Sequence, residues 1–391
     1  MKNEELKPKI RFKGYNNNWS KKKIKEVLVQ RIEHQTISFD APLLAFSYAE
    51  GVINPEDKKT NKRDFLMTDK YNKIFSRTEK DDIIYNPANI IHGAIHRNKL
   101  QTGVVSPIYK IFKCNNANPK YLGEYLHTDA FITEIAKYIE GTVIKLRTLS
   151  PEMFLDMNIK IPEEIEEQKK IGDFFEIIDS LILKEQQKYD KLVETKKALL
   201  NKMFPIKPLK VPKIRFKEFN NDWEERRFDS IFEYERPDKY IVKSDKYNNF
   251  SRTPVLTANK AFILGYTDEK NTYKKESESI IFDDFTLEAK FVDFPFMVKS
   301  SAIKILTLKD KSNDNLRFNY ELLCNTKFNI LGHARHYISV VQPEEIRTTS
   351  KEEQEKIGEF FHKIDVLEEL YGAKIEKLKN AKKALLNMML V

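Results

Sequence analysis

The feature that most constrains this chain is a helical segment that occurs twice, 186 residues apart. The first copy runs from Glu167-Gln-Lys-Lys-Ile-Gly-Asp-Phe-Phe175 to Lys196-Lys-Ala-Leu-Leu-Asn201, and the second from Glu353-Gln-Glu-Lys-Ile-Gly-Glu-Phe-Phe361 to Lys382-Lys-Ala-Leu-Leu-Asn387. About twenty of thirty-seven aligned positions are identical, and the alignment has no gap. Such identity indicates an internal repeat with one shared structural role, rather than two unrelated surface helices.

Apolar residues in both copies recur at steps of three and four, a period near 3.5 that is typical of a coiled coil. Leu181 and Leu367 continue the pattern toward the middle of each copy. Because neither helix can bury its apolar stripe alone, we expect each to need a partner, which is its own globular unit, the other helix or another subunit. The residues that we assign to this helix and subunit interface are Ile171, Phe174, Phe175, Ile178, Ile357, Phe360, Phe361 and Ile364.

A second repeat precedes each half of the chain. Pro8-Lys-Ile-Arg-Phe-Lys13 returns as Pro212-Lys-Ile-Arg-Phe-Lys217, and each is followed by a tryptophan, Trp19 or Trp223. The regions between these leaders and the helices differ almost completely. This pattern indicates a constant frame that holds two globular units with different specificities.

Runs of β-branched and aromatic residues predict strands in both variable regions. They are Pro42–Tyr48, Asp82–Tyr85 and Gly103–Phe112 in the first half, and 254–257, 279–282 and 301–307 in the second; 119–138 and 319–324 have helical spacing. The predicted fold class is therefore α+β, with two mixed α/β domains and two long helices. The predicted boundaries are domain 1 at 1–160, helix 1 at 161–204, a proline-containing linker at 205–212, domain 2 at 213–350 and helix 2 at 351–391.

Composition narrows the class of protein. A net charge of +9 and a pI near 9.0 favour a polyanionic partner. The only cysteines, Cys114 and Cys324, are too few for a disulfide framework or a zinc site. The start of the chain is charged, and no apolar run reaches the ~18 residues that a membrane span needs. We therefore expect a cytoplasmic protein without membrane contact.

Motifs for catalysis are missing from the sequence or only imitated. Asn86-Pro87-Ala88-Asn89 is the nearest match to the Asn/Asp-Pro-Pro-Tyr/Phe motif of adenine methyltransferases, but it lacks the second proline and the aromatic residue, so we interpret it as a turn. The chain has neither Gly-x-Gly nor the Gly-x-x-x-x-Gly-Lys-Ser/Thr motif of an ATP-binding loop. We predict no catalytic residue in this chain.

Two further groups of residues imitate a nuclease or a metal site. Asp283-Asp284 with Glu288 and Lys290 resembles a nuclease motif, but we interpret these residues as solvated charges. His92 and His96 would share one face of a helix; because Gly93 and Ile95 favour a loop or strand, we predict no metal site.

Nearly the whole chain resembles the specificity subunit of a Type I restriction–modification system (HsdS). The resemblance is carried by the two repeats together with Asp82-Ile-Ile-Tyr-Asn-Pro-Ala-Asn89, Gly103-Val-Val-Ser-Pro107 and His333-Ala-Arg-His-Tyr-Ile-Ser339. It implies two target-recognition domains, each reading one half of a split double-stranded DNA target. It also implies that the two helices pack antiparallel, with pseudo-twofold symmetry, as a spacer between the domains.

The resemblance implies the partners and cofactors as well. The helices would dock two methyltransferase (modification) subunits, and restriction (motor/nuclease) subunits would join the complex. S-adenosylmethionine, ATP and Mg²⁺ are expected in these partner subunits, and no cofactor is expected in this chain.

DNA recognition needs basic and amide side chains at base edges and cations on phosphates. The residues that we predict to bind DNA are Arg77, His92, Arg97, Lys145 and Arg147 in the first half, and Arg252, Lys260, His333, Arg335 and His336 in the second. Aligning Leu149-Ser150 with Ile338-Ser339 places Arg147 opposite His336. Two other classes of protein remain open: a DNA-modifying or DNA-cleaving enzyme with duplicated DNA-binding domains, and a structural coiled-coil scaffold, which would leave the two divergent units unexplained.

Overall fold

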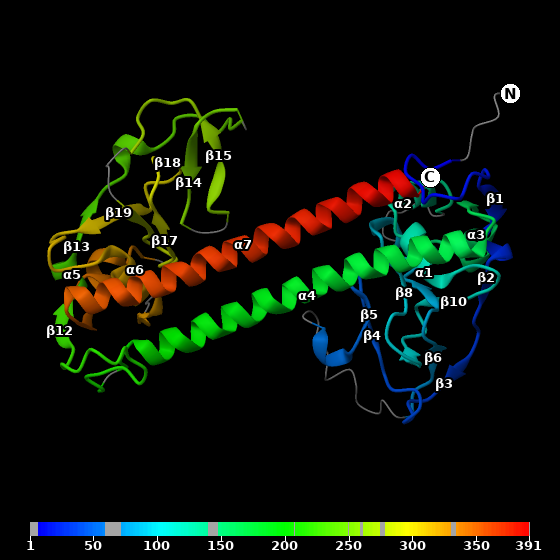
Figure 1. The fold of residues 1–391 in the computed structure, drawn as a ribbon, viewed down its shortest axis with the longest axis horizontal. Helices are drawn as coiled ribbons and strands as arrows, with labels where there is room; N and C mark the ends of the chain where they lie inside the picture. Colours follow the sequence, from blue (N-terminus) through cyan, green and yellow to red (C-terminus); the bar gives the residue numbers. More distant parts are fainter. Residues whose placement is uncertain are drawn as a thin grey trace. The chain divides into compact units, whose positions relative to one another are not determined.

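A computed structural model describes residues 7–58, 72–139, 148–206, 208–248, 250–258, 261–273, 278–329 and 334–390 (Figure 1). The chain divides into two compact units: the first unit comprises residues 1–185 with 374–391, and the second comprises residues 186–373. Each unit therefore contains the beginning of one long helix and the end of the other. The five segment boundaries predicted from the sequence stay predictions.

The first unit is built on a four-stranded antiparallel sheet with the order β2-β10-β7-β8. The strands are β2 (Leu28–Gln30), β10 (Lys110–Cys114), β7 (Ile83–Tyr85) and β8 (Ile95–Arg97). Three smaller sheets surround it: β3 (His34–Gln35) with β6 (Phe75–Thr78) and β9 (Gly103–Val105), β1 (Ser20–Lys23) with β11 (Asn158–Ile161), and β4 (Ala45–Ser47) with β5 (Gly51–Ile53). The run predicted as one strand at 103–112 is thus two strands, β9 and β10, in different sheets.

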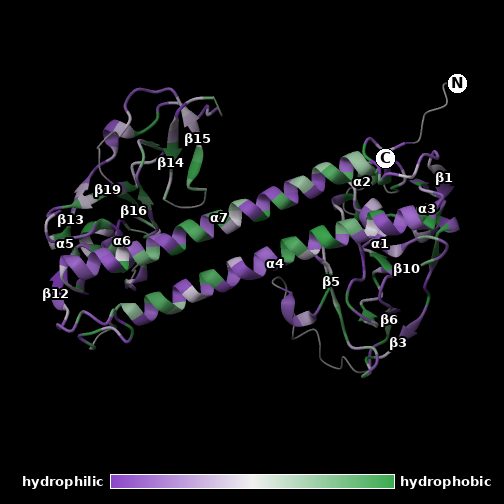
Figure 2. Ribbon diagram, viewed as in Figure 1, coloured by the Kyte–Doolittle hydropathy of each residue, from purple (hydrophilic) through white to green (hydrophobic). Residues whose placement is uncertain are grey.

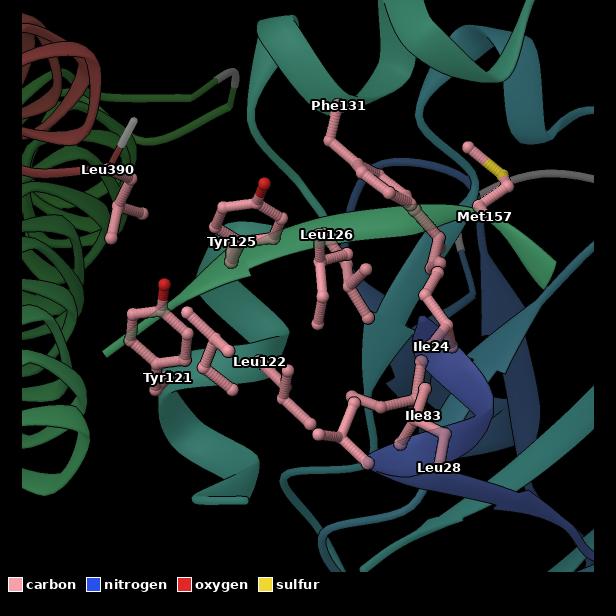
Figure 3. Packing of buried hydrophobic residues seen from close by; sticks show 14 of the residues in the cluster. Ile24, Leu28, Ile83, Tyr121, Leu122, Tyr125, Leu126, Phe131, Met157 and Leu390 are labelled. Atoms are coloured by element: carbon pink, nitrogen blue, oxygen red, sulfur yellow. The ribbon is translucent and has the colours of Figure 1, made fainter. Parts of the chain in front are cut away.

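The first unit also contains short helices. They are η1 (Ile24–Glu26), η2 (Pro55–Asp57), η4 (Ile90–His92), α1 (Pro119–Tyr125), α2 (Asp129–Ile135) and α3 (Pro151–Asp156). The helix predicted at 119–138 is two helices, because the Thr128 hydroxyl accepts a hydrogen bond from the Phe131 N–H and starts α2. Figure 3 shows Tyr121, Leu122, Tyr125 and Leu126 in one buried cluster with Ile83 of β7 and Leu28 of β2.

The second unit repeats this architecture. Its main sheet has the order β13-β19-β16-β17, with β13 (Phe232–Glu235), β19 (Ile303–Leu308), β16 (Ser279–Asp283) and β17 (Ala289–Val292). A second sheet contains β15 (Ile263–Thr267), β14 (Thr253–Leu256) and β18 (Met297–Val298), and β12 (Glu224–Arg227) pairs with β20 (Glu345–Thr348). The helices are α5 (Phe228–Ile231), η6 (Asp238–Tyr240), α6 (Leu316–Asn325) and η7 (Tyr337–Val341).

The two main sheets can be aligned residue by residue. Ile83 of β7 and Ile280 of β16 occupy the same place, since each faces the core of its unit and pairs with the strand before the α1 or α6 helix. Tyr85 and Phe282 follow at the same offset of 197 residues, and both are fully buried. The globular parts of the two units therefore share one fold although their sequences differ.

The long helices are α4 (Ile165–Met203) and α7 (Lys351–Met389), and they pack antiparallel within each unit. In the first unit Asp179 of α4 pairs with Lys382 of α7, and Glu185 pairs with Lys374. In the second unit Lys196 pairs with Asp365. Polar and apolar residues alternate along both helices (Figure 2). The predicted fold class, two mixed domains with two long paired helices and an internal repeat, is confirmed.

The apolar seam departs from the prediction at the middle of the helices. Leu181 and Leu367, expected inside the seam, are 46% and 45% exposed. The sequence period identifies apolar positions but does not say which of them a neighbour covers. Within the described part of the chain, we find no helix whose apolar stretch could span a membrane.

Candidate nucleic-acid interface

In each unit the leader segment is tied to both long helices. The Arg11 Nε donates to Glu167 at 2.6 Å, and the Arg215 Nε donates to Glu353 at 2.7 Å. Both carboxylates are buried, with 1% and 0% side-chain exposure. The same leaders reach the end of the other helix, since Ile10 N–H donates to the Met388 carbonyl and Ile214 N–H to the Lys202 carbonyl. The two repeats in the sequence thus form one frame, built twice.

A short helix of each domain sits on the start of a long helix. The Asn118 side chain caps α1 and the Asn315 side chain caps α6. The backbone N–H of each asparagine donates to a buried glutamine of the long helix at 2.9 Å, Gln168 in α4 and Gln354 in α7. These amide contacts set the register between the domain and the helix.

A glycine allows this close approach. A Cβ on Gly172 would lie 2.6 Å from the Lys120 Cβ and 2.8 Å from the Tyr121 backbone nitrogen. A Cβ on Gly358 would lie 2.7 Å from the Asn315 Oδ1. The Lys-Ile-Gly part of the repeated motif is therefore explained by the contact between the helix and its domain.

The predicted interface residues of the helices pack largely into the cores of the units. Phe175 and Phe361 are fully buried, and Ile171, Ile357 and Ile364 are buried as well. Phe174 packs edge-on against Phe12 at 5.8 Å between ring centres, and Phe360 packs against Phe216 at 6.2 Å. Of the partners that the sequence left open, its own globular unit accounts for the aromatic residues of each helix. Ile178 and Ile364 belong to the same apolar clusters as residues of the other helix.

A charged cluster joins the domain and both helices in each unit. In the first unit Lys382 pairs with Asp179 at 2.6 Å and with Glu124 of α1 at 2.8 Å, and Lys99 pairs with the same two carboxylates. Burial acts to raise the pKa of Asp179, but the two lysines outweigh it, so that the pKa is lowered. This cluster has two ammonium groups for two carboxylates.

The equivalent cluster of the second unit is not balanced. Lys196 pairs with Asp365 and lies 3.5 Å from Glu321 of α6, while Glu368 of α7 is a third carboxylate near the same lysine. Burial raises the pKa of Glu321 to about 7, with Lys196 acting in the opposite sense and Asp365 in the same sense. Burial also raises the pKa of Glu368. One lysine does not keep the buried Glu321 and the two partly buried carboxylates all ionised, so the cluster retains a proton on Glu321 near neutral pH.

Beyond this frame, the turn that follows the central strand differs between the units. In the first unit the turn comprises residues 86–94, between β7 and β8. In the second it comprises residues 284–288, between β16 and β17. The Asn86 side chain accepts a hydrogen bond from the Ala88 N–H, which confirms that Asn86–Asn89 is a turn.

A second segment, which we call the cover, lies against each turn: it contains Leu149 in the first unit and Arg335 and His336 in the second. The Leu149 N–H donates to the Pro87 carbonyl, and the His336 N–H donates to the Asp284 carbonyl. Because Pro87 and Asp284 are 197 residues apart, like the strands before them, these hydrogen bonds are equivalent. They place Leu149 opposite His336, so the sequence alignment of Leu149-Ser150 with Ile338-Ser339 is wrong by two residues. In each unit we call the turn and its cover the platform. The two platforms share this backbone hydrogen bond but differ in their turn residues, and we regard the platform as the candidate interface.

Two of the predicted DNA-binding residues of the first unit are engaged within the protein. Arg97 lies in β8, its side chain is 4% exposed, and it pairs with Asp81 at 2.5 Å and Glu176 at 2.8 Å. Arg77 lies in strand β6 and not in a loop, and it pairs with Glu79 and donates to Gln35. We therefore assign Arg97 to the contact with α4.

The remaining predicted residue of the first unit that the structure describes is His92. It is exposed at the end of η4 and lines a pocket of about 290 Å³ together with Tyr48 and His127. His96, in β8, packs against His127 with 4.6 Å between ring centres, and burial together with this neighbour lowers the pKa of His96 to about 4. Lys145 and Arg147 lie outside the described residues.

In the second unit the structure separates the predicted residues clearly. His336 is buried, with 2% exposure, and acts through its backbone. Arg335, one residue earlier, is exposed beside the turn, and Arg252 is exposed at a pocket of about 480 Å³ that Tyr266 and Phe294 also line. Lys260 and His333 lie outside the described residues.

The acidic pair Asp283-Asp284 is not solvated, contrary to the prediction. Asp283 and Asp284 are 5% and 2% exposed. Asp284 pairs with the buried Lys304 at 3.0 Å and accepts a hydrogen bond from the Tyr337 N–H, and Asp283 accepts from the Phe285 N–H. The pair is buried because it holds the turn and its cover. Among the described residues no group of three or more His, Cys, Asp and Glu side chains could hold a metal ion.

The sequence reasoning missed the residues that join the domains to the frame. Asn118, Glu124, Asn315 and Glu321 lie outside the obvious repeats, and only the offset of 197 residues relates them in pairs. A search for the partners of Lys196 and Lys382, which occur in both helix copies, would have found the glutamates.

Comparisons with known proteins agree with this architecture. Residues 220–380 match the family described as Type I restriction modification DNA specificity domain. A stretch of 131 residues is 42% identical to the Type I restriction enzyme EcoR124I/EcoR124II specificity subunit of Escherichia coli, and it covers 32% of this chain and 32% of that relative. The match therefore spans about a third of the length of the curated relative.

The fold is similar to a crystal structure of the S subunit of a Type-I restriction-modification system from M. genitalium. The TM-score is 0.66 over 99% of both chains at 14% identity, a likeness that concerns the fold alone. Fold and platform thus define a class of proteins in which a repeated helical frame holds two variable sheet domains. Within this class, the chain is similar to Type I restriction–modification specificity subunits, and its residues 220–380 match their DNA specificity domain.

Proposed function

We propose that this chain is the DNA sequence-specificity subunit of a Type I restriction–modification complex and has no catalytic role of its own. Residues 1–160 and 213–350 would be its two target-recognition domains, each reading one half of a bipartite target. The observation that carries this proposal is that the contacts of the helical frame are the same in both units, whereas the residues of the platform differ. The contacts of Arg11, Gln168 and Gly172 recur in the second unit, whereas the turn residues do not.

Charge supports DNA as the partner. The chain has 68 Lys and Arg residues against 59 Asp and Glu. Arg335 and Arg252 are exposed in the second unit, and His92 is exposed at the turn of the first. Exposed cations on phosphates supply sequence-independent affinity, and side chains at base edges supply the specificity.

The exposed apolar residues of the long helices support docking of partner subunits. Leu181 of α4 and Leu367 of α7 are equivalent in the repeat, and both are exposed beside further apolar residues, Ile177 and Leu183 on α4 and Val366 and Leu370 on α7. We infer that each patch docks one methyltransferase subunit, and that restriction subunits join that assembly. S-adenosylmethionine, ATP and Mg²⁺ would act in those partners.

The test is a methylation assay with labelled methyl donor and DNA. The full chain alone should transfer no methyl group, the methyltransferase subunits alone should show no sequence preference, and the mixture should methylate a defined bipartite sequence. Methyl transfer or DNA cleavage by the purified chain alone would contradict the proposal and favour an enzyme with duplicated DNA-binding domains.

A further inference from the structure

The platform of the second unit carries an arginine above an exposed aromatic ring. Phe285, in the turn between β16 and β17, is 47% exposed. The guanidinium carbon of Arg335, in the cover segment, lies 5.8 Å from the centre of the Phe285 ring. At this distance the ring quadrupole attracts the cation and restricts where the guanidinium lies.

Both partners are held by buried aspartates. The Asp283 carboxylate accepts hydrogen bonds from the Phe285 and Thr286 N–H groups at 3.0 and 2.9 Å, which fixes the turn. Asp284 accepts from the His336 N–H through its carbonyl and from the Tyr337 N–H through its carboxylate. The residues that flank Arg335 and Phe285 are therefore fixed to one another before any ligand arrives.

Arg335 differs from Arg77 and Arg97 in having its guanidinium donors free. Within the described parts of the chain it makes no ion pair, whereas Arg97 and Arg77 are each paired with carboxylates. The acidic residues next to it, Asp283 and Asp284, are already engaged with backbone N–H groups and with Lys304. A ligand can thus use the whole guanidinium fork without breaking an internal contact.

The first unit lacks this arrangement. The offset of 197 residues that aligns the central strands places Ala88 where the second unit has Phe285. The two units share their fold up to the ends of β7 and β16. Beyond that point the first unit has a small alanine where the second has a phenylalanine. A difference at this position is what two domains with different targets require.

Resting on the proposed function, we propose that Arg335 reads a guanine in the half-site of the second domain. Two parallel N–H groups of a guanidinium match the O6 and N7 acceptors that guanine presents in the major groove. A contact to phosphate would need charge alone, and a mobile lysine would serve equally well. An arginine held against an aromatic ring in a fixed turn is instead suited to hydrogen bonds that need a defined orientation, such as the pair to guanine. Phe285 acts here as a positioning residue.

The experiment maps methylated adenines in total genomic DNA treated with the assembled complex of the full chain and its methyltransferase subunits. It compares the wild-type chain with Arg335→Lys, Arg335→Ala and Phe285→Leu. Arg335→Lys keeps the charge and loses the fork, so it should relax one G·C position in one half-site, lowering discrimination there roughly 5- to 150-fold. Phe285→Leu should relax the same position more weakly.

A matched control is Arg236→Lys, the same change at an exposed arginine outside the turn and its cover, which should leave the motif intact. Thermal unfolding followed by Trp223 fluorescence, in a Trp19→Phe background, checks that the second unit of each variant is folded. An unchanged motif with Arg335→Lys would overturn the inference. The inference would also be overturned if Arg335→Ala lowered methylation equally at all sequences while Arg335→Lys kept the wild-type level, because that result identifies a phosphate contact. A wild-type complex without any motif would overturn the proposed function itself.

Discussion

Lys196 of α4 forms an ion pair with Asp365 of α7, and Lys382 of α7 forms the equivalent pair with Asp179 of α4. Moving the first pair by the repeat length of 186 residues, with the helices exchanged, gives the second pair. In each unit the lysine comes from the end of one helix and the aspartate from the start of the other. Each half of the sequence therefore completes the charged cluster of the other half.

Removing Lys196 should destabilise the second unit. Lys196→Met leaves Asp365 and the buried Glu321 without their cation, and losing one partner of a largely buried pair costs about 3 kcal/mol. The matched control is Lys197→Met, the same substitution at an exposed neighbour in the same helix. Urea unfolding followed by Trp223 fluorescence measures the effect, with Trp19→Phe as background so that the signal comes from the second unit alone. Equal stability of the two variants would contradict the role given to Lys196.

The glycine of the repeat gives a second prediction. Gly172→Ala should destabilise the first unit and Gly358→Ala the second, by roughly 1–3 kcal/mol each, because the added methyl meets backbone or capping atoms at under 3 Å. Gly372→Ala is the control: it lies in α7 with nothing within 4 Å of the added methyl, so it should stabilise the helix by about 0.5–1 kcal/mol. Urea unfolding of the three variants tests the prediction, and a gain in stability at Gly172 or Gly358 would show that the close contact is absent.

The extra carboxylate of the second unit predicts a pH dependence. The pKa of Glu321 is raised to about 7 in the folded chain, above its ordinary value of 4.5. A group with a raised pKa adds stability that is fully present below pH 4.5 and is lost as the pH rises through 7. The free energy of unfolding of the second unit should therefore be roughly 1 kcal/mol higher at pH 6 than at pH 8. The urea concentration at its unfolding midpoint should be higher at pH 6 as well.

Glu321→Gln isolates this effect, because the amide keeps the shape and cannot titrate. In the Trp19→Phe background, the variant should lose most of the difference between pH 6 and pH 8. The first unit, reported by Trp19 in a Trp223→Phe background, should show a smaller dependence, since its cluster has two lysines for two carboxylates. A pH dependence that persists in Glu321→Gln would assign it to other groups.

Cutting the linker tests whether the halves complete one another. Met203 and Phe204, from the end of α4, are buried in the core of the second unit, and Met389 and Leu390, from the end of α7, are buried in the core of the first. After cleavage at a protease site inserted between Pro208 and Leu209, the two fragments should co-elute in size-exclusion chromatography and separate only in denaturant. Fragments that separate under native conditions would contradict this exchange of core residues.

The sequence predicted the frame better than the interface. The helices α4 and α7 lie within the predicted ranges because the repeat and the apolar period are local signals. Residue type predicts Arg97 and His336 as DNA contacts, but both side chains are buried, since exposure depends on which carboxylate or carbonyl the fold brings near. The sequence predicts Asp284 as a solvated charge, because its partner, Lys304, lies far away in the sequence on another strand. Burial and pairing at distant positions are tertiary properties that residue type and spacing do not contain.

The most direct test of the central claim is a domain replacement read out by methylated-adenine mapping. Residues 20–157 are exchanged for the corresponding region of another specificity subunit, and the assembled complexes of both chains are compared on the same genomic DNA. The account predicts a motif in which one half changes while the other half and the spacing between them stay the same. A motif in which both halves change together, or in which neither changes, would contradict the claim that each domain reads its own half-site.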